Sequence, residues 1–244
     1  MIHKSIYAPI FEPLKNKKIS LIIPWGNVGD ILIEKACYQL MKYYGIFFTV
    51  VGFSEVKNTD FTNCEELVIC GGGNMGSRMG WQPGHLNIKE YLLSLNKPIT
   101  VLPQSYTDSA DLEGYKKIWV REKESLKWAP NALVAHDLSL SYEIKWSIKD
   151  PTEKEGVWLR EDCEQPLNFS FHKRSLGDPI CICKTVEQYI NLAATYEEII
   201  TNRLHFAIAG LLIGRRVTLL ANSYYKNQAV YENSLKELGC LWIS

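Results

Sequence analysis

The sequence predicts an α/β protein with parallel sheets, and three observations carry that prediction. Short apolar runs typical of buried strands alternate with helical patterns from residue 18 to residue 128, which indicates a doubly wound parallel sheet. A charged stretch with few apolar residues, Ser147–Glu155, follows. Strand and helix patterns then resume, so we expect a second, smaller α/β unit. The expected domains are residues 1–148 and residues 149–244, with the last helix a candidate for packing back on the first domain.

The first half of the chain contains five strand patterns with helical patterns between them. Strands are expected at Lys18–Ile23, Phe47–Phe53, Glu66–Cys70, Pro98–Leu102 and Ile118–Val120, and helices at Asp30–Tyr44, Leu86–Leu95 and Glu122–Trp128. In the first of these helices Ile31, Ala36 and Leu40 share an apolar face. Gly45 is suited to end that helix.

The second half repeats the alternation on a smaller scale. Strands are expected at Gly156–Arg160, Ile180–Cys183, Glu198–Thr201, Val217–Ala221 and Cys240–Ile243, and helices at Val186–Thr195 and Lys226–Leu238. A further helix is expected after Thr201, a good N-cap residue, because Leu204, Ile208 and Leu211 recur at helical spacing. Gly214 is placed to end it.

Bulk composition excludes several classes of protein. The chain has 244 residues with 27 basic and 27 acidic side chains, and this absence of net charge argues against a nucleic-acid binder. No apolar run approaches the roughly 20 residues of a membrane span, and the N-terminus has no signal-peptide core. The seven cysteines are scattered, which favours reduced thiols in a cytoplasmic protein. Since no ligand cluster has metal-site spacing, we expect no metal.

Polar or glycine-rich corners follow three strands of the first half, where parallel sheets bind ligands. They are Gly26–Asp30, Gly71–Asn74 and Pro103–Ser105. The match of Gly71-x-Gly73-x-x-Gly76 to a dinucleotide fingerprint is weak, because it follows the third strand and no apolar helix comes after it. The candidate binding residues are Gly26, Asn27, Gly29, Asp30, Gly72, Gly73, Asn74, Gln104, Ser105 and Asp137. For Asp30 a simple helix-capping role is equally favoured.

A candidate anion site lies in the second half. Arg203 and His205 fall in the first turn of the helix after Thr201, where free N–H groups and the positive end of the helix dipole favour anions. Arg160 and Asp162 stand two residues apart at a strand end and so point to one face. Each residue alone suits a structural role, such as an ion pair or a core histidine. Together they favour a site for an anionic substrate.

Taken in order, several motifs resemble the polysaccharide pyruvyl transferase family. They are GNVGD (Gly26–Asp30), ICGGGN (Ile69–Asn74), LPQS (Leu102–Ser105), VREKESL (Val120–Leu126), HDLSLSY (His136–Tyr142), LREDCE (Leu159–Glu164) and TNRLHFAIAGLLIGRRV (Thr201–Val217), with Lys226 downstream. The resemblance covers nearly the whole chain. It implies two Rossmann-like domains facing across a cleft, similar to GT-B glycosyltransferases, with the second domain small.

The resemblance also implies an activity. Enzymes of this family transfer pyruvate from phosphoenolpyruvate to two sugar hydroxyls as a cyclic ketal, and Arg160, Arg203 and His205 match residues implicated at the donor. Their neighbours in the matching motifs, Thr201, Asn202 and Lys226, are expected on the donor side as well. The glycine-rich corners of the first domain are expected on the acceptor side. No cofactor is expected besides the donor substrate.

The chemistry of such a transfer suits these side chains. Planar arginines bind phosphate and carboxylate groups, and a histidine can act as acid or base near neutral pH; we expect His205 to be the general acid. Asp162 and Asp30 both remain candidates for the base. The expected acceptor is a lipid-linked or nucleotide-linked glycan handled in the cytoplasm or at the inner face of the membrane, and oligomer formation is left open. The alternatives are a GT-B-type glycosyltransferase using a nucleotide sugar and a non-catalytic polysaccharide-assembly protein.

Overall fold

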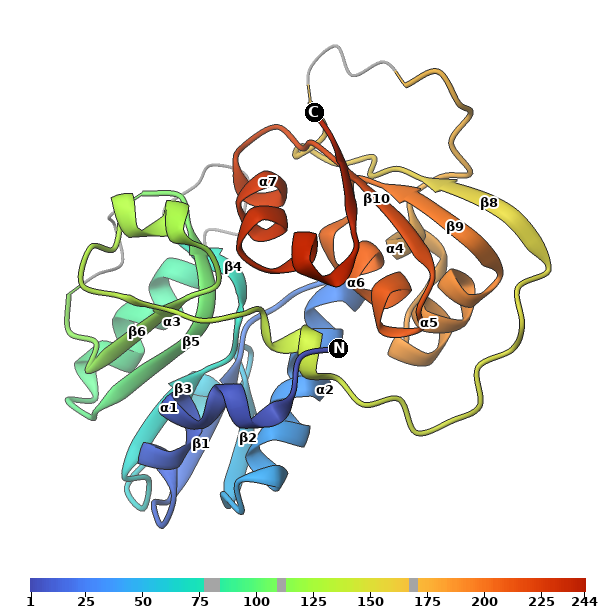
Figure 1. Ribbon diagram of the computed structural model, residues 1–244. Helices are drawn as coiled ribbons and strands as arrows, with labels where there is room; N and C mark the ends of the chain where they lie inside the picture. The colour runs from blue at the N-terminus through green and yellow to red at the C-terminus, as the bar shows by residue number, and fades with distance from the viewer. Residues whose placement is uncertain (77–83, 109–112, 167–170) are drawn as a thin grey trace. The chain divides into compact units, whose positions relative to one another are not determined.

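The computed structural model describes residues 1–76, 84–108, 113–166 and 171–244 (Figure 1). The chain divides into two compact units. The amino-terminal unit comprises Ile2–Trp25 and Ile33–Ser141, and the carboxy-terminal unit comprises Met1, Gly26–Leu32 and Tyr142–Ser244. Helix α2 (Val28–Tyr43) therefore has its first residues in the carboxy-terminal unit and the rest in the amino-terminal one.

A parallel sheet forms the centre of the amino-terminal unit. Its strands are β1 (Ile19–Ile23), β2 (Phe48–Gly52), β3 (Glu66–Ile69), β4 (Gly72–Met75), β5 (Ile99–Tyr106), β6 (Lys117–Val120) and β7 (Leu133–Val134). They run in the order β2-β1-β3-β5-β6-β7, with β4 also paired to β5. The order reverses between β1 and β3, which is the topology of a doubly wound, Rossmann-like sheet. The prediction of an α/β protein with parallel sheets is confirmed.

Two corners that the sequence placed in loops are strands instead. Gly72–Met75 is β4, and Pro103–Ser105 lies inside β5, which was expected to end at Leu102. The two segments pair with each other, Gly72 with Gln104 and Met75 with Tyr106. Pro103, which has no N–H to donate, sits where the pairing of β5 with β6 shifts register. Pairing between distant segments therefore outweighs the turn-like composition of each.

Helices and apolar side chains complete the amino-terminal unit. Besides α2 these are α1 (Ala8–Phe11), α3 (Gly84–Ser94) and short 3₁₀ turns at Lys4–Tyr7, Glu12–Leu14, Val56–Asn58, Lys123–Lys127 and Leu138–Ser141. The expected helix at Glu122–Trp128 is only a 3₁₀ turn, because Glu122 is extended and its side chain is directed into the interior. Ile22, Leu67 and Val101 from β1, β3 and β5 lie in the buried core.

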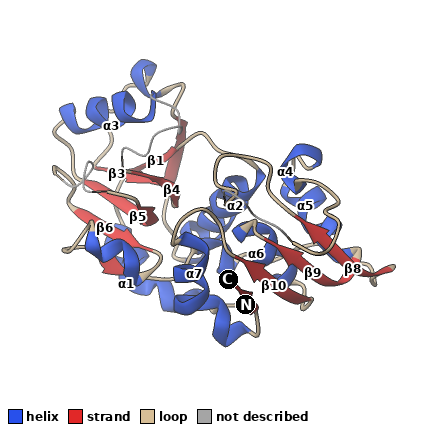
Figure 2. Cartoon of the chain, turned by 90° about the horizontal axis from the view of Figure 1, so that it is seen from above, coloured by secondary structure: helices blue, strands red, loops and turns tan. Residues whose placement is uncertain are grey.

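The carboxy-terminal unit has a smaller parallel sheet with strand order β11-β10-β9-β8. The strands are β8 (Glu153–Trp158), β9 (Tyr196–Thr201), β10 (Arg216–Leu220) and β11 (Leu241–Ile243). The helices are α4 (Pro179–Ile182), α5 (Val186–Ala194), α6 (Leu204–Leu212) and α7 (Lys226–Val230), which continues as a π turn at Tyr231–Leu235 and a 3₁₀ turn at Lys236–Leu238. Helices α5 and α6 pack side by side on β9 (Figures 1 and 2).

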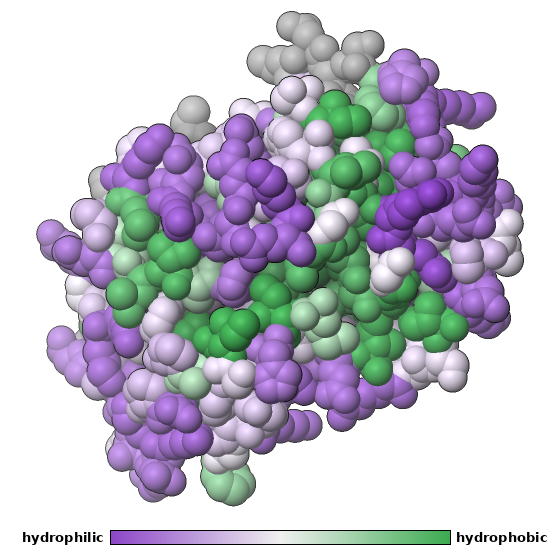
Figure 3. Space-filling model, in the orientation of Figure 1, coloured by the Kyte–Doolittle hydropathy of each residue, from purple (hydrophilic) through white to green (hydrophobic). Residues whose placement is uncertain are grey.

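Two further expectations in this unit are wrong. Ile180–Cys183 was expected as a strand, but Ile180–Ile182 lie in α4 and Cys183 is its C-cap, since Pro179 opens that helix and the Asp178 carboxylate accepts the N–H of Ile180. Glu153–Glu155, expected as linker, opens β8, because Glu153 and Glu155 pair with β9. Hydrophilic residues gather on the surface around β8 and β9 (Figure 3), and this polarity masked the strand in the sequence.

Helix α6 lies close against its sheet, and the TNRLH segment (Thr201–His205) leads into it. A Cβ on Gly210 would lie 2.7 Å from Ile199 Cδ1 and 2.9 Å from Val217 Cγ2, so only glycine permits this approach. Gly214 ends the helix with φ of 73°. The N-cap is Arg203 and not Thr201, whose hydroxyl accepts the N–H of Arg203 at 3.0 Å. None of the helices in the described ranges has the length and apolar character to cross a membrane.

Candidate functional site

The carboxyl ends of β8, β9 and β10 converge on Asn202, the residue that follows β9. Its side-chain oxygen accepts the N–H of Arg160, just beyond β8, at 2.7 Å. Its carbonyl oxygen accepts a hydrogen bond from Asn227 Nδ2 at 2.8 Å, and the same Nδ2 also donates to the carbonyl of Leu220 at the end of β10. The three strand ends are thereby fixed relative to one another.

Charged side chains alternate in sign across these strand ends. The guanidinium of Arg160 donates to Asp162 through Nε at 2.8 Å and Nη2 at 3.0 Å. Asp162 Oδ2 also lies 2.7 Å from Nη2 of Arg203. Arg203 in turn donates to Asp178 through Nε at 2.9 Å and through Nη2. Asp162 therefore bridges the two arginines, and Nη2 of Arg203 contacts both Asp162 and Asp178.

The other side of Arg160 is held by Glu164. This carboxylate accepts hydrogen bonds from Arg160 Nη1, from Lys226 Nζ at 2.6 Å and from the Tyr224 hydroxyl at 3.2 Å. Lys226 Nζ also lies 5.2 Å from the centre of the Tyr224 ring. Glu164 thus ties the segment after β8 to the start of α7.

The cluster is balanced in charge. Its cations are Arg160, Arg203 and Lys226, and its anions are Asp162, Asp178 and Glu164. The side chain of Asp162 is 30% exposed, whereas those of Asp178 and Glu164 are 2% and 3% exposed. Burial alone would raise the pKa of Asp162, but the hydrogen bonds and charge of Arg160 and the charge of Arg203 outweigh it and lower that pKa. Asp162 is therefore held ionised at the exposed part of the cluster.

The amino-terminal ends of α2 and α6 meet at His205. The His205 side chain is half-buried, and a Cβ on Gly29 would lie 2.8 Å from its Nδ1. Asn27 Oδ1 accepts the N–H of Gly29 at 2.8 Å, and Asp30 Oδ2 accepts the N–H of Asn27 at 2.8 Å. Asp30 thus acts as a cap of α2. Two helix N-termini, each with a positive dipole end, lie beside one histidine.

One buried donor in this region has no acceptor. Asn202 is fully buried, and its Nδ2 makes no hydrogen bond within the described residues. The side-chain oxygen is fixed by its bond with the N–H of Arg160, so the amide is not reversed. An unmade hydrogen bond on a buried amide costs about 1–3 kcal/mol, and a ligand oxygen would satisfy it.

A separate polar network occupies the amino-terminal unit. Arg121, 1% exposed, donates to Ser105 Oγ at 2.7 Å and to Asp137 Oδ2 at 2.9 Å. Ser105 donates to Glu122 at 3.0 Å. Burial raises the pKa of Glu122 to about 7, against the opposing effects of the Arg121 charge and the serine hydrogen bonds. Gln104 Nε2 donates to the carbonyl of Cys70 at 2.5 Å.

The structure thus separates the expected site residues into two groups. The carboxy-terminal unit brings together Gly26, Asn27, Gly29, Asp30, Arg160, Asp162, Thr201, Asn202, Arg203, His205 and Lys226. The other unit holds Gly72, Gly73, Gln104, Ser105 and Asp137, and the side chain of Asn74 lies outside the described residues. In the glycine-rich strand, a Cβ on Gly73 would lie 3.4 Å from Nη2 of Arg121.

Sequence reasoning missed Asp178, Glu164, Arg121 and Glu122 as parts of these clusters. Glu164, Arg121 and Glu122 all lie inside motifs that the sequence had singled out, and their burial is what shows their role. Asp178 had a local signal, because an aspartate directly before a proline is typical of a helix start. Its contact with Arg203, 25 residues away, had none.

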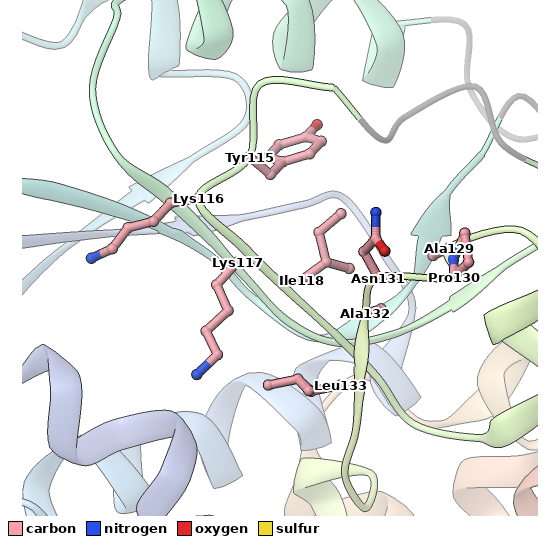
Figure 4. A pocket seen from close by; sticks show the side chains of 9 residues that line it. All are labelled: Tyr115, Lys116, Lys117, Ile118, Ala129, Pro130, Asn131, Ala132 and Leu133. Atoms are coloured by element: carbon pink, nitrogen blue, oxygen red, sulfur yellow. The ribbon is translucent and has the colours of Figure 1, made fainter.

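A pocket of about 450 Å³ in the amino-terminal unit is distinct from both clusters (Figure 4). It lies between Tyr115–Ile118, which lead into and begin β6, and Ala129–Leu133, which lead into β7. These are the amino ends of the strands, whereas ligands bind at the carboxyl ends of such sheets. No expected site residue lines it. In the described part of the chain, no group of three or more His, Cys, Asp and Glu residues has a metal-binding arrangement.

Fold and site together define an α/β protein with Rossmann-like parallel sheets and a charged cluster at the carboxyl ends of three strands. The chain belongs to the polysaccharide pyruvyl transferase family, whose model matches residues 27–224. Among curated proteins, it is 24% identical over 264 residues to the Bacillus subtilis (strain 168) protein named "Putative pyruvyl transferase EpsO", with 83% of this chain and 80% of that protein covered. The family resemblance predicted from the motifs is confirmed.

A solved structure shares the fold. It is that of a functionally uncharacterized protein from Klebsiella pneumoniae subsp. pneumoniae NTUH-K2044, with a TM-score of 0.73 and 23% identity. The match covers 96% of this chain and 95% of that one. At this identity the likeness establishes the fold alone.

Proposed function

We propose that the protein transfers pyruvate from phosphoenolpyruvate to two hydroxyls of a sugar in a surface-polysaccharide precursor, forming a cyclic ketal and releasing phosphate. The family supports a transferase. The observation that carries the proposal is the convergence of Asn202, Arg203 and His205 with the N-terminus of α2 at one sheet edge. Helix N-termini and arginine are the groups that bind phosphate and carboxylate.

In this proposal the donor binds at the strand ends of the carboxy-terminal unit. Its anionic groups are received by the positive ends of α2 and α6, by the Nδ2 donor of Asn202 and by Arg203 and Arg160. Thr201 supports the turn through its bond to the N–H of Arg203. Lys226, which is paired with Glu164, adds positive charge beside Arg160. Because Gly29 has no side chain, the imidazole of His205 fits against the start of α2.

The reaction then needs one proton at carbon and two lost from the acceptor. His205 protonates the methylene carbon of phosphoenolpyruvate, which becomes the methyl group, and C2 becomes electrophilic. One sugar hydroxyl attacks C2, phosphate departs, and the second hydroxyl closes the ketal. One hydroxyl proton restores the histidine and the other leaves with phosphate. Histidine suits this exchange because it gains and loses protons near neutral pH.

The base that takes a hydroxyl proton and passes it on is Asp30 or Asp162. The lowered pKa of Asp162 makes it a weaker proton acceptor than an ordinary carboxylate. This favours a role in which Asp162 stays ionised and balances the charges of the arginines. Asp30 already accepts the N–H of Asn27 through one oxygen, which leaves the other oxygen for a hydroxyl. The glycine-rich strand β4 and its neighbours Gln104, Ser105 and Asp137 are proposed on the acceptor side. The expected cleft between the units, the cytoplasmic location and the lipid-linked acceptor stay predictions.

An assay of phosphate release tests the proposal. The protein is incubated with phosphoenolpyruvate and glycosides of galactose, mannose or N-acetylhexosamine, and mass spectrometry checks the glycan for a pyruvate ketal. We expect release only when an acceptor is present, and its loss in His205→Gln. Absence of release with every acceptor, together with thermal stabilisation by UDP or GDP but not by phosphoenolpyruvate, would point to a nucleotide-sugar glycosyltransferase instead.

A further inference from the structure

The Asp178 carboxylate accepts four hydrogen bonds beside Arg203. Asp178 is 4% exposed. Its Oδ1 accepts from Nε of Arg203 at 2.9 Å and from the N–H of Ile180 at 3.2 Å. Its Oδ2 accepts from Nη2 of Arg203 and from the N–H of Glu161 at 3.0 Å. Both oxygens are thereby engaged by groups of the protein itself, and the carboxylate is fixed by two backbone N–H groups.

This arrangement fixes the plane of the Arg203 guanidinium. Two parallel N–H···O bonds to one carboxylate set the rotation of an arginine fork, which a single contact does not. Arg203 is 5% exposed, and a charge buried to that degree needs a paired counter-charge. Burial lowers the pKa of Arg203, but the hydrogen bonds and charge of Asp178, together with the charge of Asp162, outweigh that effect and the net shift is upward. Asp178 therefore keeps the guanidinium both charged and oriented.

The nitrogen that Asp178 orients also faces the exposed part of the cluster. Nη2 of Arg203 lies 2.7 Å from Oδ2 of Asp162, whose side chain is 30% exposed. An anion that displaces Asp162 would meet the guanidinium at this nitrogen. The direction in which Arg203 presents its charge is thus set by Asp178, a residue on a different segment.

We propose that Asp178 is a positioning residue for donor binding, which holds Arg203 in the orientation that receives an anionic group of phosphoenolpyruvate without touching the donor itself. This inference rests on the proposed function. It extends that function to a residue outside every matching motif, at the start of α4. If Asp178 were a purely structural anchor, it would stabilise the fold in the same way, but the effect of its substitution on donor affinity would not depend on Arg203.

A double-mutant cycle distinguishes the two roles. The variants are Asp178→Asn, Arg203→Lys and the combination, with dissociation constants for phosphoenolpyruvate measured by titration calorimetry on the full chain. We expect Asp178→Asn to weaken binding roughly tenfold, because the Arg203 guanidinium loses the carboxylate that fixes its orientation. In the Arg203→Lys background the same change should alter affinity less than about twofold, because a lysine cannot form the fork that Asp178 orients.

A matched control is the surface pair of Arg216 and Glu198, 3.6 Å apart in the same unit. Glu198→Gln removes a carboxylate from an arginine on β10 and should leave affinity unchanged. If Asp178→Asn fails to fold, Asp178→Glu keeps the charge but displaces the fork, and the same loss of affinity is expected.

Each outcome has one meaning. Wild-type affinity in a folded Asp178 variant, or equal losses in both arginine backgrounds, overturns the positioning role and leaves the proposed function intact. Absence of phosphoenolpyruvate binding by the wild-type protein overturns both. Weakened binding that depends on Arg203 supports the inference.

Discussion

A Cβ atom on Gly29 would lie 2.8 Å from Nδ1 and 2.9 Å from Cβ of His205. Such contacts are closer than carbon and nitrogen atoms tolerate, so the absence of a side chain on α2 is what allows His205 its place on α6. Gly29→Ala should therefore displace the imidazole and lower kcat for pyruvyl transfer by at least roughly tenfold, since small misplacements of a catalytic group have effects of that size or more.

Stability helps to separate the possible causes of such a loss. The helix propensity of alanine, about 1 kcal/mol better than that of glycine, offsets part of the cost of the close contact, so a loss of activity in Gly29→Ala with little change in melting temperature points to the histidine. Gly52→Ala is a matched control, because the nearest atom to its Cβ would be 3.5 Å away. Unchanged turnover in Gly29→Ala would contradict the placement of His205 at the reaction centre.

Asn202→Asp tests the unpartnered amide. The substitution keeps an oxygen for the N–H of Arg160 but replaces the Nδ2 donor with a second anionic oxygen beside the proposed donor site. We expect phosphoenolpyruvate to bind roughly tenfold or more weakly, because a charge-assisted hydrogen bond is replaced by repulsion. Calorimetric titration measures this change. Asn191→Asp, on the exposed side of α5, should leave affinity unaltered, and equal affinities in both variants would remove Asn202 from the site.

Asp162→Asn should have the opposite effect on affinity. Asp162 places a negative charge between the guanidinium groups of Arg160 and Arg203, where it repels or competes with an incoming anion. We expect inorganic phosphate and phosphoenolpyruvate to bind several-fold more tightly to the asparagine variant, at low salt most of all. Glu161→Gln removes the same charge from the neighbouring, exposed residue and is the control.

The same variant reports on the chemistry. If Asp162 were the catalytic base, its removal would lower kcat by roughly 10²–10⁴-fold at saturating donor. The lowered pKa of this carboxylate predicts a much smaller change. A kcat loss of that size would assign the base to Asp162, whereas weaker phosphate binding would show that Asp162 orients the arginines.

Glu122→Gln tests the pH dependence of stability in the amino-terminal unit. Burial raises the pKa of Glu122 to about 7 from an ordinary 4.5, so between those values the folded state holds a proton that the unfolded state has lost. This contribution to stability is complete below pH 4.5 and falls away as pH rises to 7, by on the order of 3 kcal/mol. Glutamine has no proton to lose and should remove the decline.

Thermal or urea unfolding of both proteins between pH 5 and pH 8 measures this difference. We expect the stability of Glu122→Gln relative to wild type to increase with pH across that range. Glu124→Gln, in the same turn with a side chain 36% exposed, should show no such trend. Parallel pH profiles for wild type and Glu122→Gln would mean that Glu122 is ionised throughout.

Much of the candidate site was predictable because its signals are local. Gly26–Asp30 and Thr201–His205 stand where a strand pattern gives way to a helix pattern, and parallel strands place such joints at one sheet edge. The partners of the arginines were not predictable in the same way. Asp178 reaches Arg203 only because α4 folds beside the start of α6, and no spacing in the sequence encodes that approach.

The sequence by itself determined the α/β class, most helices and strands, the family and the residues around His205, because periodicity, capping residues and motif order are properties of neighbouring positions. Only the tertiary structure decided that Gly72–Met75 and Pro103–Ser105 pair as strands and that Gly26–Leu32 groups with the carboxy-terminal unit. It also decided that Arg160 and Arg203 are paired with carboxylates, those of Asp162 and Asp178. These are contacts between segments far apart in the chain, and their energies depend on burial and on partners that local sequence does not specify.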